Sequence, residues 1–205
     1  MIKTFVAICC ICLLVVGCAT TAVKTTQQEK TKKVIYNAKG EMQSFYTFQY
    51  NAFDKERKNH FSPSGTLLNY SMYSYDKERK RSKKVEYDPK GNVLSYTTYD
   101  YDIQGKRTKK SIFDSSDQLK KYFTYEYDNN GKRVKRNQYN PENKFESYVT
   151  YAYDEKGKRT KKTTYNNDGA IMSYSVYEYD SNGNKTKKID YDAENVMKEY
   201  AVFQY

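Results

Sequence analysis

One stretch of this chain, YDIQGKRTKKSIFDSSDQLKKYFTYEY at 101–127, is followed by two stretches of the same pattern, at 127–153 and 153–179. Tyrosines recur every 26 residues, at Tyr75, Tyr101, Tyr127, Tyr153, Tyr179 and Tyr205. Tyr50 precedes Tyr75 by 25 residues, and 31–50 is a partial unit that begins in mid-repeat. Because a fixed period of this length is typical of repeat architectures, 31–205 is predicted to be one tandem-repeat domain.

Each unit contains two turn signals. We number the first Tyr of a unit as position 0. Asp then stands at position 1 and Gly at position 4, as in Asp128 and Gly131. A second turn follows the aromatic residue at position 12, and Gly, Asp or Asn stands at position 16. Because Asp opens type I turns and Gly, Asn and Asp tolerate positive φ, both signals predict hairpins with a G1 bulge.

The segments between the turns are rich in Thr, Tyr and β-branched residues and are too short for helices. They predict an all-β fold, an antiparallel up-and-down meander of 26-residue two-strand repeats with about 14 strands. At roughly 4.8 Å per strand the sheet would be on the order of 60 Å wide. Because a sheet of this width does not stay flat, we expect it to coil or curl as an open sheet.

The turn spacing also predicts which side chains share a face. With a four-residue turn, one face carries the aromatic positions 0, 12 and 24, the apolar position 18 and the basic positions 6 and 8. The other face carries the aromatic position 21 and a second basic row at position 9. The early units depart from the pattern, since Arg57 and Arg79 stand where Gly is expected. We expect a shortened strand at 58–61 and a kink or frayed edge near 50–62.

The basic rows are the best candidate for a functional site. On the predicted register, lysines at position 8 lie beside tyrosines at position 24, with arginines at position 6 on the other flank. The candidate polymer-binding residues are Lys109, Lys135, Lys161, Lys187, Arg107, Arg133, Arg159, Tyr99, Tyr125, Tyr151 and Tyr177. Such a ladder could stabilise the sheet through cation–π contacts, or it could bind an anionic or sugar polymer. The two roles are compatible.

Composition limits the class of protein. The chain has 205 residues, 36 Lys+Arg against 25 Asp+Glu, 24 Tyr, no Trp and a mean hydropathy of −1.02. This polarity excludes a protein with several membrane-spanning helices. The low aliphatic content resembles that of disordered chains, but a chain that is 16% aromatic can still bury a large area.

The first eighteen residues predict export and lipidation. Lys3 precedes an apolar run at 5–17, which has the length of a signal peptide and is too short to span a bilayer. The tetrapeptide at 15–18, VVGC, resembles the lipobox of bacterial lipoproteins. This resemblance implies acylation (such as palmitate) of Cys18 and an anchor in the cell envelope, in the outer membrane where one exists. Residues 1–17 are then expected to be the lipoprotein signal peptide, and 18–30 the lipidated Cys and a flexible tether.

The repeat core, YxYD followed by Gly three residues after the Asp, resembles the YD repeat of bacterial surface and toxin-shell proteins, which include the RHS proteins. In that family the repeats build a β-sheet that spirals into a shell, and the role is scaffolding or binding. The resemblance covers 31–205. We expect this chain to depart from that family, because it is too small to enclose a passenger and its sequence shows no toxin-like segment after the last repeat.

Little in the sequence suggests catalysis. His60 is the one histidine, and all four cysteines lie at or before Cys18, so no disulfide or thiolate site is expected downstream. Asp180 in DSNGN at 180–184 is expected to accept backbone hydrogen bonds in its turn, not to bind calcium. We expect no metal, no other cofactor and no enzyme. Because the protein is expected to be exported, we expect no nucleic-acid partner despite the basic charge.

The expected function is that of a non-enzymatic envelope lipoprotein that binds anionic or glycan polymers or the cell surface. A purely structural or protein-partner role, such as an assembly component or antigen, is the main alternative, and an unrecognised enzyme is the second. Polymer binding predicts an interaction that weakens with salt. A structural or protein-partner role predicts a stoichiometric protein partner, and an enzyme predicts one asymmetric cleft.

Overall fold

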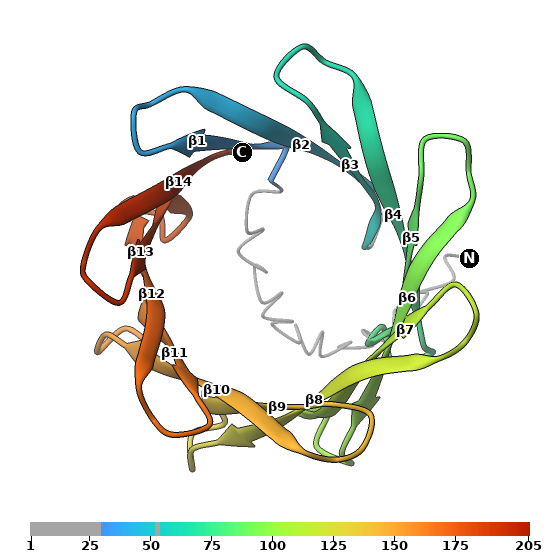
Figure 1. The fold of residues 1–205 in the computed structure, drawn as a ribbon, viewed down its shortest axis with the longest axis vertical. Coiled ribbons are helices and arrows are strands. Elements are labelled where there is room, and N and C mark those ends of the chain that lie inside the picture. The colour runs from blue at the N-terminus through green and yellow to red at the C-terminus, as the bar shows by residue number, and fades with distance from the viewer. Residues whose placement is uncertain (1–29, 52–53) are drawn as a thin grey trace, which may run out of the picture.

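The computed structural model describes residues 30–51 and 54–205, which form fourteen strands (Figure 1). The predicted signal segment, Cys18 and the rest of the tether before residue 30 lie outside the described residues. The strands are β1 (Lys32–Asn37), β2 (Met42–Tyr50), β3 (Lys55–Phe61), β4 (Leu67–Tyr75), β5 (Arg81–Tyr87), β6 (Val93–Tyr101), β7 (Arg107–Asp114), β8 (Leu119–Tyr127), β9 (Arg133–Tyr139), β10 (Phe145–Tyr153), β11 (Arg159–Asn166), β12 (Ile171–Tyr179), β13 (Lys185–Asp192) and β14 (Met197–Gln204).

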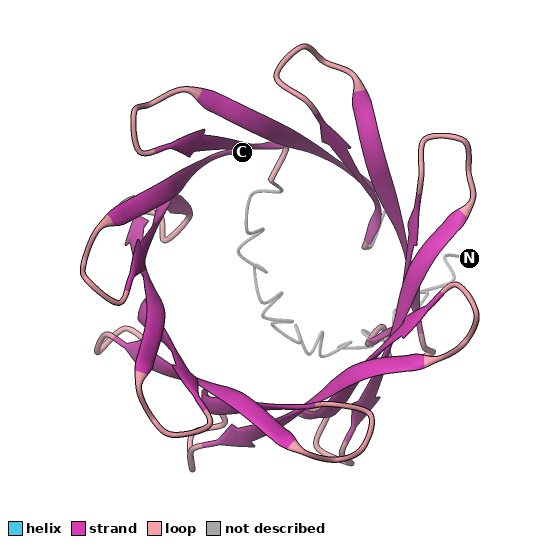
Figure 2. Ribbon diagram, viewed as in Figure 1, coloured by secondary structure: helices cyan, strands magenta, loops and turns pink. Residues whose placement is uncertain are grey.

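All described secondary structure is strand joined by short loops, as Figure 2 shows. Within these residues no helix is long and apolar enough to cross a bilayer. Each strand pairs antiparallel with its neighbours in sequence, so the predicted all-β meander is confirmed.

The predicted open sheet is wrong, because the fourteen strands form a closed barrel in which β1 pairs with β14 (Figure 1). At this seam Lys32 lies opposite Gln204 and Lys33 opposite Phe203. Lys32 and Lys33 hold positions 8 and 9 of the repeat, and Gln204 and Phe203 hold positions 25 and 24. The same positions pair between neighbouring strands inside the barrel, such as β8 and β9. Strand β1 has the positions of an odd strand, and β14 has those of the even strand that precedes an odd strand in the repeat, so the two edges are complementary. Pairing them satisfies the backbone groups that an open sheet would leave at its edges.

Both predicted turns have the expected geometry. The Asp128 N–H donates to the Lys132 carbonyl at 2.9 Å, and the Gly131 N–H donates to the Asp128 carbonyl at 2.9 Å. Gly131 has φ of 76°, which favours a residue without a Cβ. At position 16, Asp117, Asn143 and Asn195 adopt φ of 62° to 65°. Position 16 therefore requires the left-handed conformation and accepts Gly, Asn or Asp.

Every hairpin also contains a second bulge that the turn spacing did not predict. In β8–β9 Tyr127 pairs with Arg133 but Glu126 pairs with Lys135, so residue 134 is extra. At the other end Phe113 pairs with Leu119 but Ile112 pairs with Lys121, so residue 120 is extra. One extra residue moves all later side chains to the opposite face.

The predicted faces are therefore wrong in part. Positions 8, 12, 18 and 21 share one face of the sheet, and positions 6, 9, 22, 24 and 0 share the other. Position 22 is buried in six units, whereas position 25, whose side chain points the opposite way from position 24, is exposed in all seven. The face with positions 22, 24 and 0 is the enclosed, concave face of the barrel.

The early irregularity is confined to one turn. The prediction of a shortened strand is wrong, since β3 has seven residues, as do β5 and β9. Arg57 does not occupy a turn but lies in β3 opposite Gln49. Tyr50 pairs with Lys55, which makes this turn one residue shorter than the equivalent turn between Tyr75 and Arg81. The missing residue explains the 25-residue spacing.

Position 0 joins each unit to the strand before it. The Tyr127 hydroxyl donates to the Arg107 carbonyl at 2.8 Å, and Tyr153 donates to the Arg133 carbonyl at 2.8 Å. The other five bonds of this kind are made by Tyr50, Tyr75, Tyr101, Tyr179 and Tyr205. Position 0 is Tyr in all seven units, whereas positions 12, 21 and 24 also accept Phe. The hydroxyl bond explains this difference.

Candidate binding surface in the barrel lumen

Two rings of cations face the lumen. The first, ring 6, occupies position 6 and consists of Lys30, Lys55, Arg81, Arg107, Arg133, Arg159 and Lys185. The second, ring 9, occupies position 9 and consists of Lys33, Lys58, Lys84, Lys110, Arg136, Lys162 and Lys188. The even strands between these cations contribute aromatic residues at positions 24 and 0. The concave wall therefore alternates positive charge and aromatic rings around the barrel.

The arginines of ring 6 lie over tyrosine rings. The guanidinium carbon of Arg133 lies 4.3 Å from the centroid of Tyr125 and 5.6 Å from that of Tyr127. Arg107 and Arg159 repeat this contact on Tyr99 and Tyr151, each at 4.4 Å. These distances are in the range of cation–π contacts, so the stabilising role that the sequence suggested is present.

The stacking leaves hydrogen-bonding capacity unused. The Nε atoms of Arg81, Arg107, Arg133, Arg136 and Arg159 are shielded and have no hydrogen-bond partner among the described residues. In Arg107 and Arg133 an Nη2 donates to a tyrosine hydroxyl at 3.3 Å. Because a guanidinium has five N–H donors, each side chain can still bind an anionic group.

The lumen lysines are crowded by other cations. Burial, followed by repulsion from Lys84, Arg136, Arg107 and Lys121, lowers the pKa of Lys110 to about 8. Burial, followed by neighbouring cations, likewise lowers the pKa of Lys33, Lys55 and Lys185 to about 8. The charged lumen is therefore costly by itself, and a bound anion would relieve that cost.

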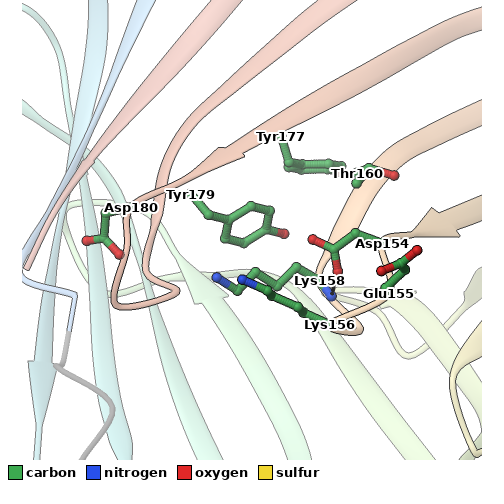
Figure 3. Close-up of a pocket in the computed structure, with 8 residues that line it drawn as sticks. All are labelled: Asp154, Glu155, Lys156, Lys158, Thr160, Tyr177, Tyr179 and Asp180. Atoms are coloured by element: carbon green, nitrogen blue, oxygen red, sulfur yellow. Dashed lines mark hydrogen bonds between the residues drawn. The ribbon is translucent and has the colours of Figure 1, made fainter.

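A cleft of about 460 Å³ opens at the rim, between the turns that begin at Asp154 and Asp180 (Figure 3). Figure 3 shows the ring of Tyr179 directed toward Lys158 and Asp154. Lys158 Nζ lies 5.6 Å from the Tyr179 centroid. The Asp154 carboxylate accepts the backbone N–H of Lys158 at 2.7 Å, so this acid is engaged in its own turn. The cleft therefore presents lysine and tyrosine side chains to the lumen rim.

Asp180 also plays the turn role that the sequence predicted. Its carboxylate accepts the Asn184 backbone N–H at 2.8 Å and the Asn184 side-chain amide at 3.2 Å. Because both carboxylate oxygens are used within the turn, this loop is built as an Asx turn.

The structure divides the sequence-predicted candidates between the two faces. Tyr99, Tyr125, Tyr151 and Tyr177 share the lumen with Arg107, Arg133 and Arg159. The position-8 lysines Lys109, Lys135, Lys161 and Lys187 point outward, so the predicted contact between positions 8 and 24 is wrong. Lys109 Nζ lies 4.5 Å from the centroid of Tyr122, at position 21, because the unpredicted bulge shifts the register by one residue.

The outer face also pairs its aromatic residues across strands. Tyr122 and Tyr139 stack with centroids 5.0 Å apart, and Tyr148 and Tyr165 with centroids 4.6 Å apart. Lys109 caps the first pair and Lys135 the second, and Lys161 caps a third pair, Tyr174 and Tyr191, whose centroids are 4.8 Å apart. Each Nζ lies 4.3 to 4.8 Å from a ring centroid. Outside the barrel, cation and aromatic side chains mainly contact one another.

Sequence reasoning placed the ring 9 residues Lys110, Arg136, Lys162 and Lys188 on the face opposite the arginines of ring 6. In the barrel the two rings lie on one face. The bulges at positions 7 and 19 bring the two rings together, and no residue type marks those positions, so the local sequence carried no signal for this placement.

No family model matches this chain, and no curated protein matches it. Solved structures with a related chain path include a porin-like protein from Bacteroides uniformis, with 11% identity, a TM-score of 0.47, and coverage of 86% of this chain and 98% of that chain. A protein described as an outer membrane lipoprotein-sorting protein domain from Vibrio parahaemolyticus has 12% identity, a TM-score of 0.40 and coverage of 86% and 82%. The YD-repeat resemblance stays a sequence-based expectation.

Proposed function

We propose that this protein is a non-enzymatic, lipid-anchored protein of the cell envelope that binds acidic polymers, such as anionic polysaccharides, in the lumen of its barrel. The observation that carries the proposal is the pair of inward-facing cation rings with aromatic residues between them. Guanidinium groups form charge-assisted hydrogen bonds with carboxylate, sulfate or phosphate, and tyrosine rings can stack on sugar rings.

The direct test compares the inner and outer basic rows. The inner variant replaces Arg107, Arg133 and Arg159 with Gln, and the matched outer variant replaces Lys109, Lys135 and Lys161 with Gln. Both remove three positive charges from the same three strands. The protein is purified in a nonionic detergent, and its affinity for heparin and for purified cell-wall glycan is measured over a salt series.

The inner variant is expected to lose at least tenfold in affinity, whereas the outer variant is expected to lose no more than the general effect of reduced net charge. Binding of the wild type should weaken with salt, because ions screen the attraction. An equal loss of affinity in both variants would mean that binding depends on the general surface charge and not on the lumen. No binding by the wild type at low salt would favour the structural or protein-partner alternative.

The envelope location rests on the sequence of residues 1–18. A Cys18→Ser variant is expected to leave the membrane fraction, because the acyl chains attached to that Cys would be lost. A variant that sediments with membranes as completely as the wild type would contradict the lipid anchor. Lys30 lies beside Phe203 at the rim formed by the position-1 turns, with Nζ 4.3 Å from the ring centroid, so the anchor would join the barrel at this end.

A further inference from the structure

The cation rings are not equally neutralised around the barrel. In the lumen, carboxylates stand on β5, β13 and β14, as Glu86, Asp190 and Glu199. The strands β7, β9 and β11 have Ile112, Gln138 and Thr164 at the position where β5 and β13 have Glu86 and Asp190. The lumen of a sevenfold repeat is therefore electrostatically one-sided.

On the acidic side two of the ring 9 lysines, Lys84 and Lys188, are already paired with carboxylates. Lys84 Nζ lies 2.7 Å from a Glu86 carboxylate oxygen, and the Ser95 hydroxyl donates to the same carboxylate at 3.0 Å. Lys188 forms an ion pair with Asp190, which also accepts a hydrogen bond from the Ser175 hydroxyl at 2.5 Å. An incoming anion would have to compete with these carboxylates.

On the other side six cations gather without such partners. This cationic wall consists of Arg107, Lys110, Lys121, Arg133, Arg136 and Arg159, on β7, β8, β9 and β11. Its four arginines all have an Nε without a hydrogen-bond partner among the described residues. Near these cations, Glu146 accepts a hydrogen bond from the Gln138 side chain at 2.8 Å. Glu146 lies at the rim opposite to the one that the position-1 turns form.

The charges acting on Lys110 support the same division. They come from Lys84, Arg136, Arg107 and Lys121 and all lower its pKa. Lys33 and Lys58, in the same ring, are each influenced by a carboxylate, Glu199 and Glu86 respectively. The charges that act on Lys110 are therefore all positive, whereas those that act on Lys33 and Lys58 include a carboxylate.

The spacing of the wall limits the ligand. Arg107, Arg133 and Arg159 stand on alternate strands, so they recur about every 10 Å around the barrel. This interval is close to the length of one extended disaccharide. Tyr125 and Tyr151 lie between the arginines and offer aromatic surface to the sugar rings.

We infer that the cationic wall is the primary binding site, and that it takes a linear polysaccharide with one anionic group on each successive disaccharide. The inference rests on the proposed function, and it assigns the binding energy to one side of the lumen. The opposite side, with its paired lysines, contributes less.

Two double variants within ring 9 test the inference. Lys110→Gln/Arg136→Gln removes two charges from the wall, and Lys84→Gln/Lys188→Gln removes two from the paired side. Affinity for a fluorescent hyaluronan hexasaccharide, which carries one carboxylate per disaccharide, is measured by anisotropy with the full chain in nonionic detergent. We expect at least a tenfold loss for the first variant and at most a threefold loss for the second.

Two further variants separate charge from folding. Lys110→Arg/Arg136→Lys keeps both charges and should restore affinity to within threefold of the wild type. Glu86→Gln/Asp190→Asn frees the paired lysines, and should change affinity by less than threefold if the wall dominates. Thermal unfolding of each variant confirms that it folds.

The outcomes distinguish the inference from the proposed function. If the wild type binds and both Gln double variants lose affinity equally, the lumen is a uniform ring and the inference is wrong. A large gain for Glu86→Gln/Asp190→Asn would overturn it as well. If the wild type does not bind the hyaluronan hexasaccharide or heparin at low salt, the proposed function itself fails.

Discussion

The Thr31 backbone N–H donates to the Gln204 carbonyl oxygen at 2.9 Å, across 173 residues of sequence. This bond belongs to the seam between β1 and β14. The same positions pair at the seam as at the junctions inside the barrel where an even strand is followed by an odd strand, such as β8 and β9. Lys30 occupies ring 6 at the seam, with its Nζ 4.3 Å from the Phe203 centroid, as Arg133 lies 4.3 Å from that of Tyr125. The seam thus lacks only the covalent turn.

A circular permutant should therefore fold. We would join Tyr205 to Lys30 through Asp-Asn-Asn-Gly-Lys, the turn found at 128–132, and open the chain between Asn129 and Asn130. Since every strand keeps its neighbours, we expect the far-ultraviolet circular dichroism spectrum to be retained and the unfolding midpoint to change by only a few degrees. If the permutant fails to fold although the same linker is tolerated at another turn of the protein, the result would contradict the closed barrel.

Tyr127→Phe should lower the free energy of unfolding by about 1 kcal/mol, because it removes the hydroxyl that donates to the Arg107 carbonyl. The control is Tyr165→Phe at position 12, where Phe61 and Phe113 stand in other units, and a change within about 0.5 kcal/mol is expected there. Urea unfolding of both variants measures the difference. Equal effects would mean that the hydroxyl bond does not explain the constancy of position 0.

Gly131→Ala should destabilise the barrel by about 1 kcal/mol, since Ala is strained at φ of 76°. A Cβ there would also lie 3.3 Å from Lys106 Cε, a contact that the lysine must relieve. The matched change is Gly169→Asn at position 16, where three units already have Asn or Asp. It should cost no more than about 0.5 kcal/mol, because Asn tolerates the left-handed conformation. Unfolding midpoints at fixed pH and salt provide the measurement.

Polyanion binding should weaken as the pH rises from 7 to 9.5. Lys33, Lys55, Lys110 and Lys185 have pKa values of about 8 and lose their charge in this range. We expect a several-fold loss of heparin affinity with a midpoint near pH 8. Residual binding should persist, because the arginines stay charged. A flat profile from pH 7 to 9.5 would exclude a contribution from these lysines.

Stability of the free protein should change in the opposite direction over the same range. Burial and neighbouring cations lower the pKa of these four lysines below the value of 10.5 that applies to the unfolded chain. Between the two values the unfolded chain binds more protons, so the free energy of unfolding increases with pH. The increase should be largest at low ionic strength. A falling urea midpoint between pH 7 and 9.5 would contradict this assignment.

Much of this fold could be predicted from local sequence alone. The tyrosine period gave the number of strands, and Asp128 with Gly131 gave the turn type, because hairpin turns depend on the φ preferences of a few adjacent residues. Local chemistry also identified Arg107, Arg133 and Arg159 with Tyr99, Tyr125 and Tyr151 as partners. The second bulge was not predictable in this way, because no residue type marks position 7 or 19.

That bulge decided where the candidate binding residues point. It carried Lys109 to the outside and brought Lys110 into the lumen beside Arg107. The sequence by itself determined a β-repeat with alternating basic and aromatic positions, since those features depend on residue type and period. Only the tertiary structure decided that the sheet closes, which face is enclosed, and that Lys110 and Arg136 lie together away from Glu86 and Asp190. Strand register and barrel closure depend on pairing between distant segments, such as Thr31 with Gln204, and a local pattern does not specify that pairing.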